Sequence, residues 1–140
     1  MIHTYTIPGR LISLNKYINL QRANKWGGAS VKKAETERCA WACKKLPVIT
    51  KKVDVIIDWY VPSKREDKDN IIFAKKFLLD GLVEAGKLKN DGWSEIGAFT
   101  EDVLIDKQNP RIEVSLREVT EYKLPGEQEV RDSLSKIGIK

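Results

Sequence analysis

The chain has 140 residues, of which 32% are charged and 41% are apolar, and its net charge at pH 7 is +5. This length suits one domain with one buried core, and no apolar stretch approaches the roughly 20 residues that span a membrane. The N-terminus, Met1 to Tyr5, lacks the basic-then-apolar layout of a signal peptide. We therefore expect a cytoplasmic domain with no membrane contact.

Charge is distributed unevenly along the chain. Residues 1–65 hold 13 Lys and Arg against 4 Asp and Glu, a net charge of +9, whereas residues 66–140 hold 12 against 16, a net charge of −4. A basic half is suited to a polyanion such as DNA, because Lys and Arg neutralise phosphates. The alternative is a solvated surface on which the charges happen to segregate.

Strand and helix signals alternate along the first half of the chain. β-Branched and aromatic residues with period-two spacing predict strands, and a capping serine followed by a later proline bounds a helix. We expect a strand at residues 2–7, a loop at 14–28, a helix at 29–46 and a strand at 52–61. Cys39 and Cys43, four residues apart on that helix, indicate buried thiols, since one distant histidine does not complete a zinc site.

The second half is predicted to contain one amphipathic helix and two strands. They are expected at residues 70–85, 96–105 and 111–117. The strand expected at 96–105 is interrupted by Glu101-Asp102. The five-residue turn at 106–110 predicts that this strand and the next form a hairpin. Residues 1–118 are thus predicted to form a single α/β (α+β) domain, a mixed β-sheet packed by two main helices. Residues 119–140 are an expected extension with a possible short helix at 127–137.

Two aspartates at the mouth of the second helix, Asp67 and Asp69, stand two residues apart. Side chains with this spacing point the same way from an extended chain, so their charges are forced together. Such a pair favours a hard cation, and Mg²⁺ takes oxygen ligands from one or two carboxylates, waters and substrate phosphates. The alternative is that both aspartates cap the helix.

Other uses of a D-x-D pattern fit this chain less well. An EF-hand loop that starts at Asp67 needs glycine at its sixth position and glutamate at its twelfth, where this chain has Ile72 and Leu78. A nucleotide-sugar transferase needs a larger nucleotide-binding domain than this chain supplies. Metal-assisted phosphodiester hydrolysis, in contrast, needs only carboxylates, a water and a cation that neutralises the developing charge.

The chain supplies each part of that chemistry. The carboxylates are Asp67, Asp69 and, just past the helix, Asp91. Lys76 is the candidate cation because it shares a predicted helical face with Asp69 and Asp80. Lys75 is the neighbouring alternative.

Further motifs accompany the aspartates, namely Asp80-Gly81-Leu82, Gly86 and Asn90-Asp91. With Asp67-x-Asp69-Asn70 and the helical lysine, this spacing resembles the core of the RusA-type Holliday junction resolvases. The pattern of that family is roughly D-x-D-N, a lysine, D-A-L, a glycine and D-D before a strand. The likeness includes Leu14 to Tyr17 and spans residues 1 to about 118. It departs from the family in a longer interval between Asp69 and Asp80, in Asn90, and in the tail.

The resemblance implies a RusA-like homodimer that binds four-way DNA junctions and nicks two opposed strands, as in DNA recombination and repair. Asp67, Asp69 and Asp91 match the acids that hold Mg²⁺, which Mn²⁺ can replace, and Lys76 matches the catalytic lysine. The candidate DNA-binding residues are Asn15, Lys16, Arg22, Lys25, Lys32 and Lys33. Tyr17 and Trp26 are candidates for stacking on unpaired bases, with core packing as the alternative for both.

Two other functions stay open, a non-enzymatic nucleic-acid-binding protein and a metal-dependent phosphohydrolase acting on small nucleotides.

The length of chain between the acids limits whether Asp91 can reach Asp67 and Asp69 of the same chain. The predicted helix at 70–85 is about 22 Å long, and the six steps from Ala85 to Asp91 return at most about 20 Å. Asp91 of a dimer partner would arrive without this strain. We therefore predict a site shared between subunits, with a kinked helix as the alternative.

Overall fold

The computed structural model describes residues 1–119, apart from the side chain of Lys25. Its elements are β1 (Ile2–Pro8), α1 (Leu14–Ala23), α2 (Lys25–Ala42), β2 (Val53–Val61), α3 (Lys68–Ile72), α4 (Lys75–Glu84), β3 (Ile96–Ile105) and β4 (Arg111–Glu118). The predicted single α/β domain with a mixed sheet is confirmed for this part of the chain. The helix predicted at 127–137 lies outside the described residues.

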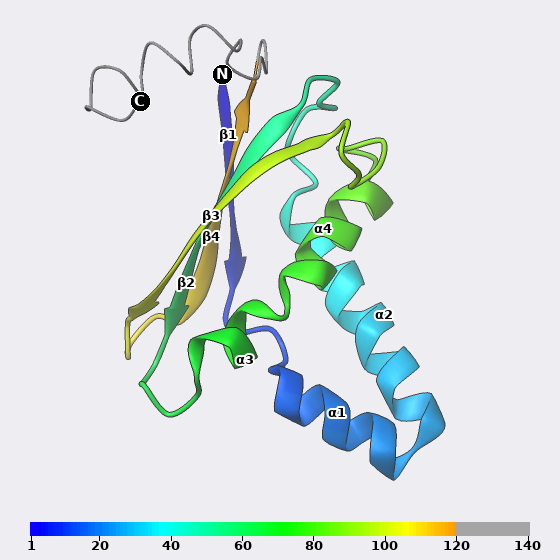
Figure 1. Ribbon diagram of the computed structural model, residues 1–140, viewed down its shortest axis with the longest axis vertical. Helices are drawn as coiled ribbons and strands as arrows, with labels where there is room; N and C mark the ends of the chain where they lie inside the picture. Colours follow the sequence, from blue (N-terminus) through cyan, green and yellow to red (C-terminus); the bar gives the residue numbers. More distant parts are fainter. Residues whose placement is uncertain (120–140) are drawn as a thin grey trace, which may run out of the picture.

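The four strands form one sheet in the order β1-β4-β2-β3. Strand β2 runs parallel to β3 and antiparallel to β4, and β1 runs antiparallel to β4. Figure 1 shows the helices on one side of this sheet. Alternate residues of β2, from Val53 to Val61, are buried against them, as its period-two pattern predicts. No helix within residues 1–119 has the length and apolar character needed to cross a membrane.

The hairpin predicted between the last two strands is wrong, because β2 lies between β3 and β4. Residues 106–110 carry the chain across the end of β2, and the N–H of Asp106 donates to the carbonyl of Val61 there (2.9 Å). Neighbouring strands are about 4.8 Å apart, so this connection spans about 10 Å. Five residues can span one strand spacing, as in a hairpin, or two, as in this crossing. The length of the turn therefore does not distinguish the two topologies.

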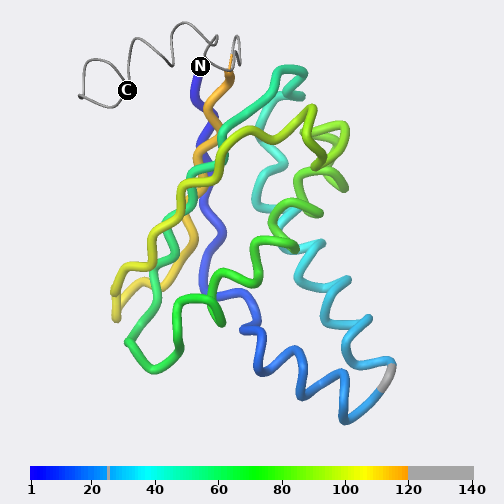
Figure 2. The backbone as a smooth tube through the Cα atoms, in the orientation of Figure 1, coloured from blue at the N-terminus to red at the C-terminus, as the bar shows by residue number. Residues whose placement is uncertain are grey.

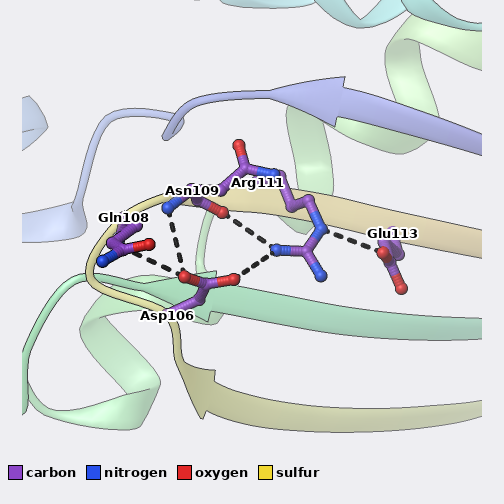
Figure 3. Close-up of polar contacts among 5 residues, drawn as sticks. All are labelled: Asp106, Gln108, Asn109, Arg111 and Glu113. Carbon is purple, nitrogen blue, oxygen red and sulfur yellow. Dashed lines mark hydrogen bonds and ion pairs between the residues drawn. The ribbon is translucent and has the colours of Figure 1, made fainter.

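The carboxylate of Asp106 organises this crossing. Its Oδ1 accepts hydrogen bonds from two N–H groups of the turn, and its Oδ2 from Nη1 of Arg111 at 2.8 Å, as Figure 3 shows. Arg111 also contacts Glu113 at 2.9 Å and lies over the ring of Tyr60, 3.8 Å from its centroid. The bond from Arg111, followed by the turn N–H groups, lowers the pKa of Asp106, so the carboxylate stays charged at neutral pH.

The loop predicted at 14–28 is helical, so that prediction is wrong. Gly27 and Gly28, at the end of the predicted loop, both lie in the first turn of α2. A Cβ on Gly28 would lie 2.4 Å from Cγ of Gln21 on α1. These glycines therefore allow two helices to approach closely, and α1 and α2 form a helical hairpin whose corner lies far from the sheet (Figure 2).

The helix predicted at 70–85 is broken into α3 and α4. Around Phe73 and Ala74 the backbone hydrogen bonds follow the i to i−3 pattern of a 3₁₀ turn. The N–H of Ala74 donates to the carbonyl of Ile71, and the N–H of Phe77 donates to the carbonyl of Ala74. The rings of Phe73 and Phe77 pack edge to face 5.5 Å apart, and Ala74 is fully buried beside them. The continuous helical face that was predicted to carry both Asp69 and Lys76 is therefore interrupted.

The core lies between the sheet and the pair α2 and α4. Both cysteines are buried free thiols there, as predicted. Burial raises the pKa of Cys39 to about 12 and also raises the pKa of Cys43, so neither is a reactive thiolate. A Cβ on Gly81 of α4 would lie 2.5 Å from Cβ of Cys39 and 2.8 Å from the backbone nitrogen of Ala40. This close approach leaves no room for a side chain at position 81.

Substituting Gly81 tests this packing. Gly81→Ala is expected to lower the free energy of unfolding by about 1–3 kcal/mol through overpacking, although alanine is the better helix former. Urea denaturation followed by circular dichroism measures it. Gly92→Ala is the matched control, since nothing lies within 4 Å of a Cβ there. Equal stability of the two variants would contradict the close contact of α2 with α4.

Candidate functional site

A polar cleft of about 360 Å³ opens where α1 and α3 begin. Its lining comes from two segments far apart in sequence, Arg10, Ser13, Asn15 and Lys16 from the first and Arg65, Glu66, Asp67 and Asn70 from the second. The cleft thus places two predicted DNA-binding residues, Asn15 and Lys16, beside a predicted metal ligand, Asp67.

Asn70 holds the two sides of the cleft together. Its side chain is 8% exposed, its oxygen accepts the backbone N–H of Asn15 at 2.9 Å, and its amide donates to Glu66 at 3.1 Å. The other oxygen of Glu66 accepts a hydrogen bond from Arg10 at 2.6 Å. We call these four residues the clasp. Their polar groups are hydrogen-bonded to one another at a partly buried position.

The charge of Glu66 depends on its partner. Burial by itself would raise the pKa of Glu66, but the hydrogen bond and positive charge of Arg10 outweigh burial and lower it below the usual 4.5. A depressed pKa in the folded state means that the contribution to stability is present above the unfolded pKa. It is lost as the pH falls through the folded value, so the clasp is intact at neutral pH.

Asp67 and Asp69 are both exposed at the beginning of α3. Asp67 is the residue that precedes the helix, yet its side chain makes no capping hydrogen bond. Hydrogen-bonded capping therefore does not account for Asp67. Two exposed carboxylates separated by one residue fit Mg²⁺, because this ion keeps several waters and needs only one or two carboxylates.

Asp91 lies elsewhere, in a hollow of about 350 Å³ formed with Gly92, Trp93, Ile96, Gly97 and Phe99. Val53 pairs with Ile96, so Asp91 is near the beginning of β2, whereas Asp67 follows the end of that strand. The nine residues of β2 span roughly 26 Å. Within residues 1–119 no three His, Cys, Asp or Glu side chains are grouped to hold a metal. The structure does not bring the predicted trio together within one chain.

The two candidate lysines differ in their surroundings. Nζ of Lys75 contacts Glu101 at 3.0 Å and lies 4.2 Å from the centroid of the Phe99 ring. Glu101 also accepts from the indole of Trp59 at 3.3 Å, and β3 runs through it without the predicted interruption. Lys76 is 63% exposed, with its ammonium 4.0 Å from Asp80. Of the two, Lys76 has the more accessible charge.

The remaining predicted DNA-binding residues lie on the helical hairpin. Arg22, Lys32 and Lys33 are exposed on α1 and α2, and the side chain of Lys25 lies outside the described part of the chain. Tyr17 is half-buried, with its ring 5.4 Å from Phe73 and 5.8 Å from Phe77 between centroids. Trp26 is 70% exposed. The core-packing alternative therefore holds for Tyr17 and fails for Trp26.

Comparison of the chain with models of protein families and with curated protein sequences finds no match. The resemblance to the RusA-type resolvases rests on the motif residues alone. Sequence reasoning missed Arg10 and Glu66, because no local pattern signals an ion pair between residues 56 positions apart.

The clasp gives a stability prediction. Asn70→Ala leaves the N–H of Asn15 and one oxygen of Glu66 without a partner, and we expect it to cost about 1–3 kcal/mol of unfolding free energy. Thermal or urea unfolding measures this loss. Asn19→Ala, at an exposed position on α1, is the control and should change stability little. An Asn70 variant as stable as the Asn19 variant would show that the clasp does not join the two segments.

Proposed function

We propose that this chain is a Mg²⁺-dependent, structure-selective endodeoxyribonuclease of the RusA type that nicks four-way DNA junctions as a homodimer. The observation that carries the proposal is the cleft at the beginning of α1 and α3. There the clasp places the exposed carboxylate of Asp67 beside Asn15 and Lys16. A phosphate group bound between them would meet both a positive charge and a carboxylate suited to a metal.

Each part of the proposed site has a role. Asp67 and Asp69 would hold Mg²⁺, which when bound activates a water and neutralises charge at the phosphate. Lys76 would stabilise the negative charge that develops on the reacting phosphate. The clasp keeps the beginning of α3 in place relative to Lys16, and the exposed basic residues of α1 and α2 would bind the backbone of the DNA arms.

A homodimer would complete the site. In one chain the length of β2 separates Asp91 from Asp67, whereas the partner's Asp91 would reach the cleft in a two-fold arrangement. The surroundings of Asp91 support a contact there, since Trp93 is 92% exposed and β3 is an edge strand. Exposed apolar side chains beside an edge strand are typical of surfaces that another protein covers.

The activity test uses labelled four-way, flap and linear DNA with and without Mg²⁺. We expect Asp67→Asn, Asp69→Asn and Asp91→Asn each to lower the rate of junction nicking by about a hundredfold or more, since each removes a charge that holds the metal. Junction affinity should stay the same or rise, because repulsion of phosphate is relieved. Asp102→Asn, exposed on β3, is the control.

The same assay separates the alternatives. Junction binding by wild-type protein without any Mg²⁺-dependent nicking would indicate a non-enzymatic DNA-binding protein. Competition by free nucleotide but not by long DNA would indicate a phosphohydrolase. Loss of folding together with loss of activity in the aspartate variants would assign them a structural role.

Subunit mixing tests the shared site. Asp69→Asn and Asp91→Asn proteins are each expected to be inactive alone, but in a shared arrangement their heterodimer would contain one doubly substituted site and one intact site. Nicking of a single strand should therefore return, up to the fraction of heterodimer, as seen on denaturing gels. A mixture that stays inactive, although heterodimers are shown by tagged pull-down, would mean that each site is built within one chain.

A further inference from the structure

The helices leave one strand of the sheet uncovered on the face that they pack against. On that face, Val55 and Val61 of β2 are at most 3% exposed. Their partners in the parallel pairing are Phe99 and Ile105 of β3, which are 42% and 48% exposed. Val103, between these two, is half-buried. The cover of the sheet therefore ends between β2 and β3, and we call Phe99, Val103 and Ile105 the β3 stripe.

The β3 stripe is part of a larger apolar surface at the edge of the sheet. Strand β3 is an edge strand, so its outer side has no neighbouring strand among residues 1–119. Phe99 also lines the hollow around Asp91, together with Trp93 and Ile96. The stripe and the hollow are thus continuous through Phe99. Apolar side chains that stay exposed along an edge strand are typical of a surface that another protein covers.

The charges in the middle of the stripe are suited to a second copy of this chain. Glu101 lies on the strand between Phe99 and Val103, and its carboxylate is 3.0 Å from Nζ of Lys75. Both side chains are partly exposed, Lys75 by 28% and Glu101 by 15%. A two-fold axis near Glu101 would place this ion pair beside the same pair of the other copy, so that each charge meets its opposite.

The direction of β3 decides which residues two such copies would share. Because β3 runs parallel to β2, Ile105 lies beside Val61 at the end of β2, and Asp67 follows shortly after that end. Asp91 precedes the beginning of β3. When two β3 strands lie antiparallel, the beginning of one lies beside the end of the other. The partner's Asp91 is then at the same end of the sheet as Asp67.

We propose that a second copy of this chain covers the β3 stripe with its own stripe, with the two β3 strands antiparallel, and that this contact brings the partner's Asp91 to the cleft at α3. The inference rests on the proposed function for the role of the completed site. It adds the surface and the orientation of the homodimer. A parallel arrangement would instead place the two Asp91 residues together and leave both clefts incomplete.

Sedimentation equilibrium without DNA or Mg²⁺ tests the surface. Phe99→Asp and Ile105→Asp should each raise the dissociation constant of the dimer by about a hundredfold or more, because each would bury an unpaired charge in the contact. Ile2→Asp is the matched control, since Ile2 is an apolar residue, 57% exposed, on β1 at the opposite edge of the sheet. Circular dichroism checks that each variant is folded. A monomeric wild-type protein, or folded stripe variants as dimeric as Ile2→Asp, would overturn the proposal.

Cross-linking tests the orientation with the stripe left intact. Gly92→Cys and Lys107→Cys place thiols before and after β3, whose ten residues span roughly 30 Å. A Cβ at position 92 meets nothing within 4 Å, and Lys107 is exposed. With a bis-maleimide, a mixture of the two variants should give a cross-linked dimer on denaturing gels, whereas each variant alone should not. The buried Cys39 and Cys43 are the same in all samples. Cross-linking of Gly92→Cys to itself, or none in the mixture, would overturn the antiparallel arrangement.

The two proposals fail in different ways, because neither sedimentation nor cross-linking depends on catalysis. An antiparallel dimer through the β3 stripe, formed by a protein without any Mg²⁺-dependent nicking, supports the interface and refutes the nuclease. Junction nicking by a protein whose dimer is unaffected by Phe99→Asp and Ile105→Asp leaves the nuclease intact and refutes the interface. Nicking at the wild-type rate by a monomeric Ile105→Asp protein refutes the contribution of the partner's Asp91.

Discussion

The parallel pairing of β2 with β3 is the constraint on which the site depends. Parallel neighbours cannot be joined by a tight turn, so the chain must return from the end of β2 to the beginning of β3. Helices α3 and α4 make this return. Asp67 and Asp69 lie where this connection between β2 and β3 begins, and Asp91 lies near its end. Acids that are 22 to 24 positions apart in sequence are therefore held at opposite ends of a strand.

The second half of the site comes from the N-terminal segment. Arg10 and Asn15 are joined to the beginning of α3 by hydrogen bonds to Glu66 and Asn70, and these bonds cross more than 50 positions of sequence. Together with the packing of Tyr17 on Phe73 and Phe77, these bonds fix the position of Lys16 relative to the exposed carboxylates. Apolar packing of α2 on α4, as close as Gly81 allows, provides the rigid support behind both helices.

Three surfaces follow from this arrangement, namely the polar cleft, the hollow around Asp91 and the corner of the helical hairpin. They lie on different parts of the molecule, and the proposed homodimer and branched DNA are partners large enough to join them. Under the proposed function, the exposed basic residues of the helical hairpin, Lys16, Arg22, Lys32 and Lys33, would neutralise the phosphates of such DNA.

Local patterns were enough for much of this protein. The strands with period-two burial, the buried cysteines and the exposed D-x-D pair all depend on residues close in sequence, where side-chain spacing decides which face is buried. The same local signals were misleading at Gly27 and Gly28, which allow helix contact and do not mark a loop.

Tertiary structure decided the rest. The break at Phe73 depends on rings brought together from α1 and α4, and the crossing at Asp106 depends on which strand lies between β3 and β4. Exposure of Trp26 and partial burial of Tyr17 depend on what packs against each ring, since both are aromatic residues in one basic segment. The separation of Asp91 from Asp67 likewise needed strand direction, because sequence spacing limits how far apart two residues can lie but does not bring them together.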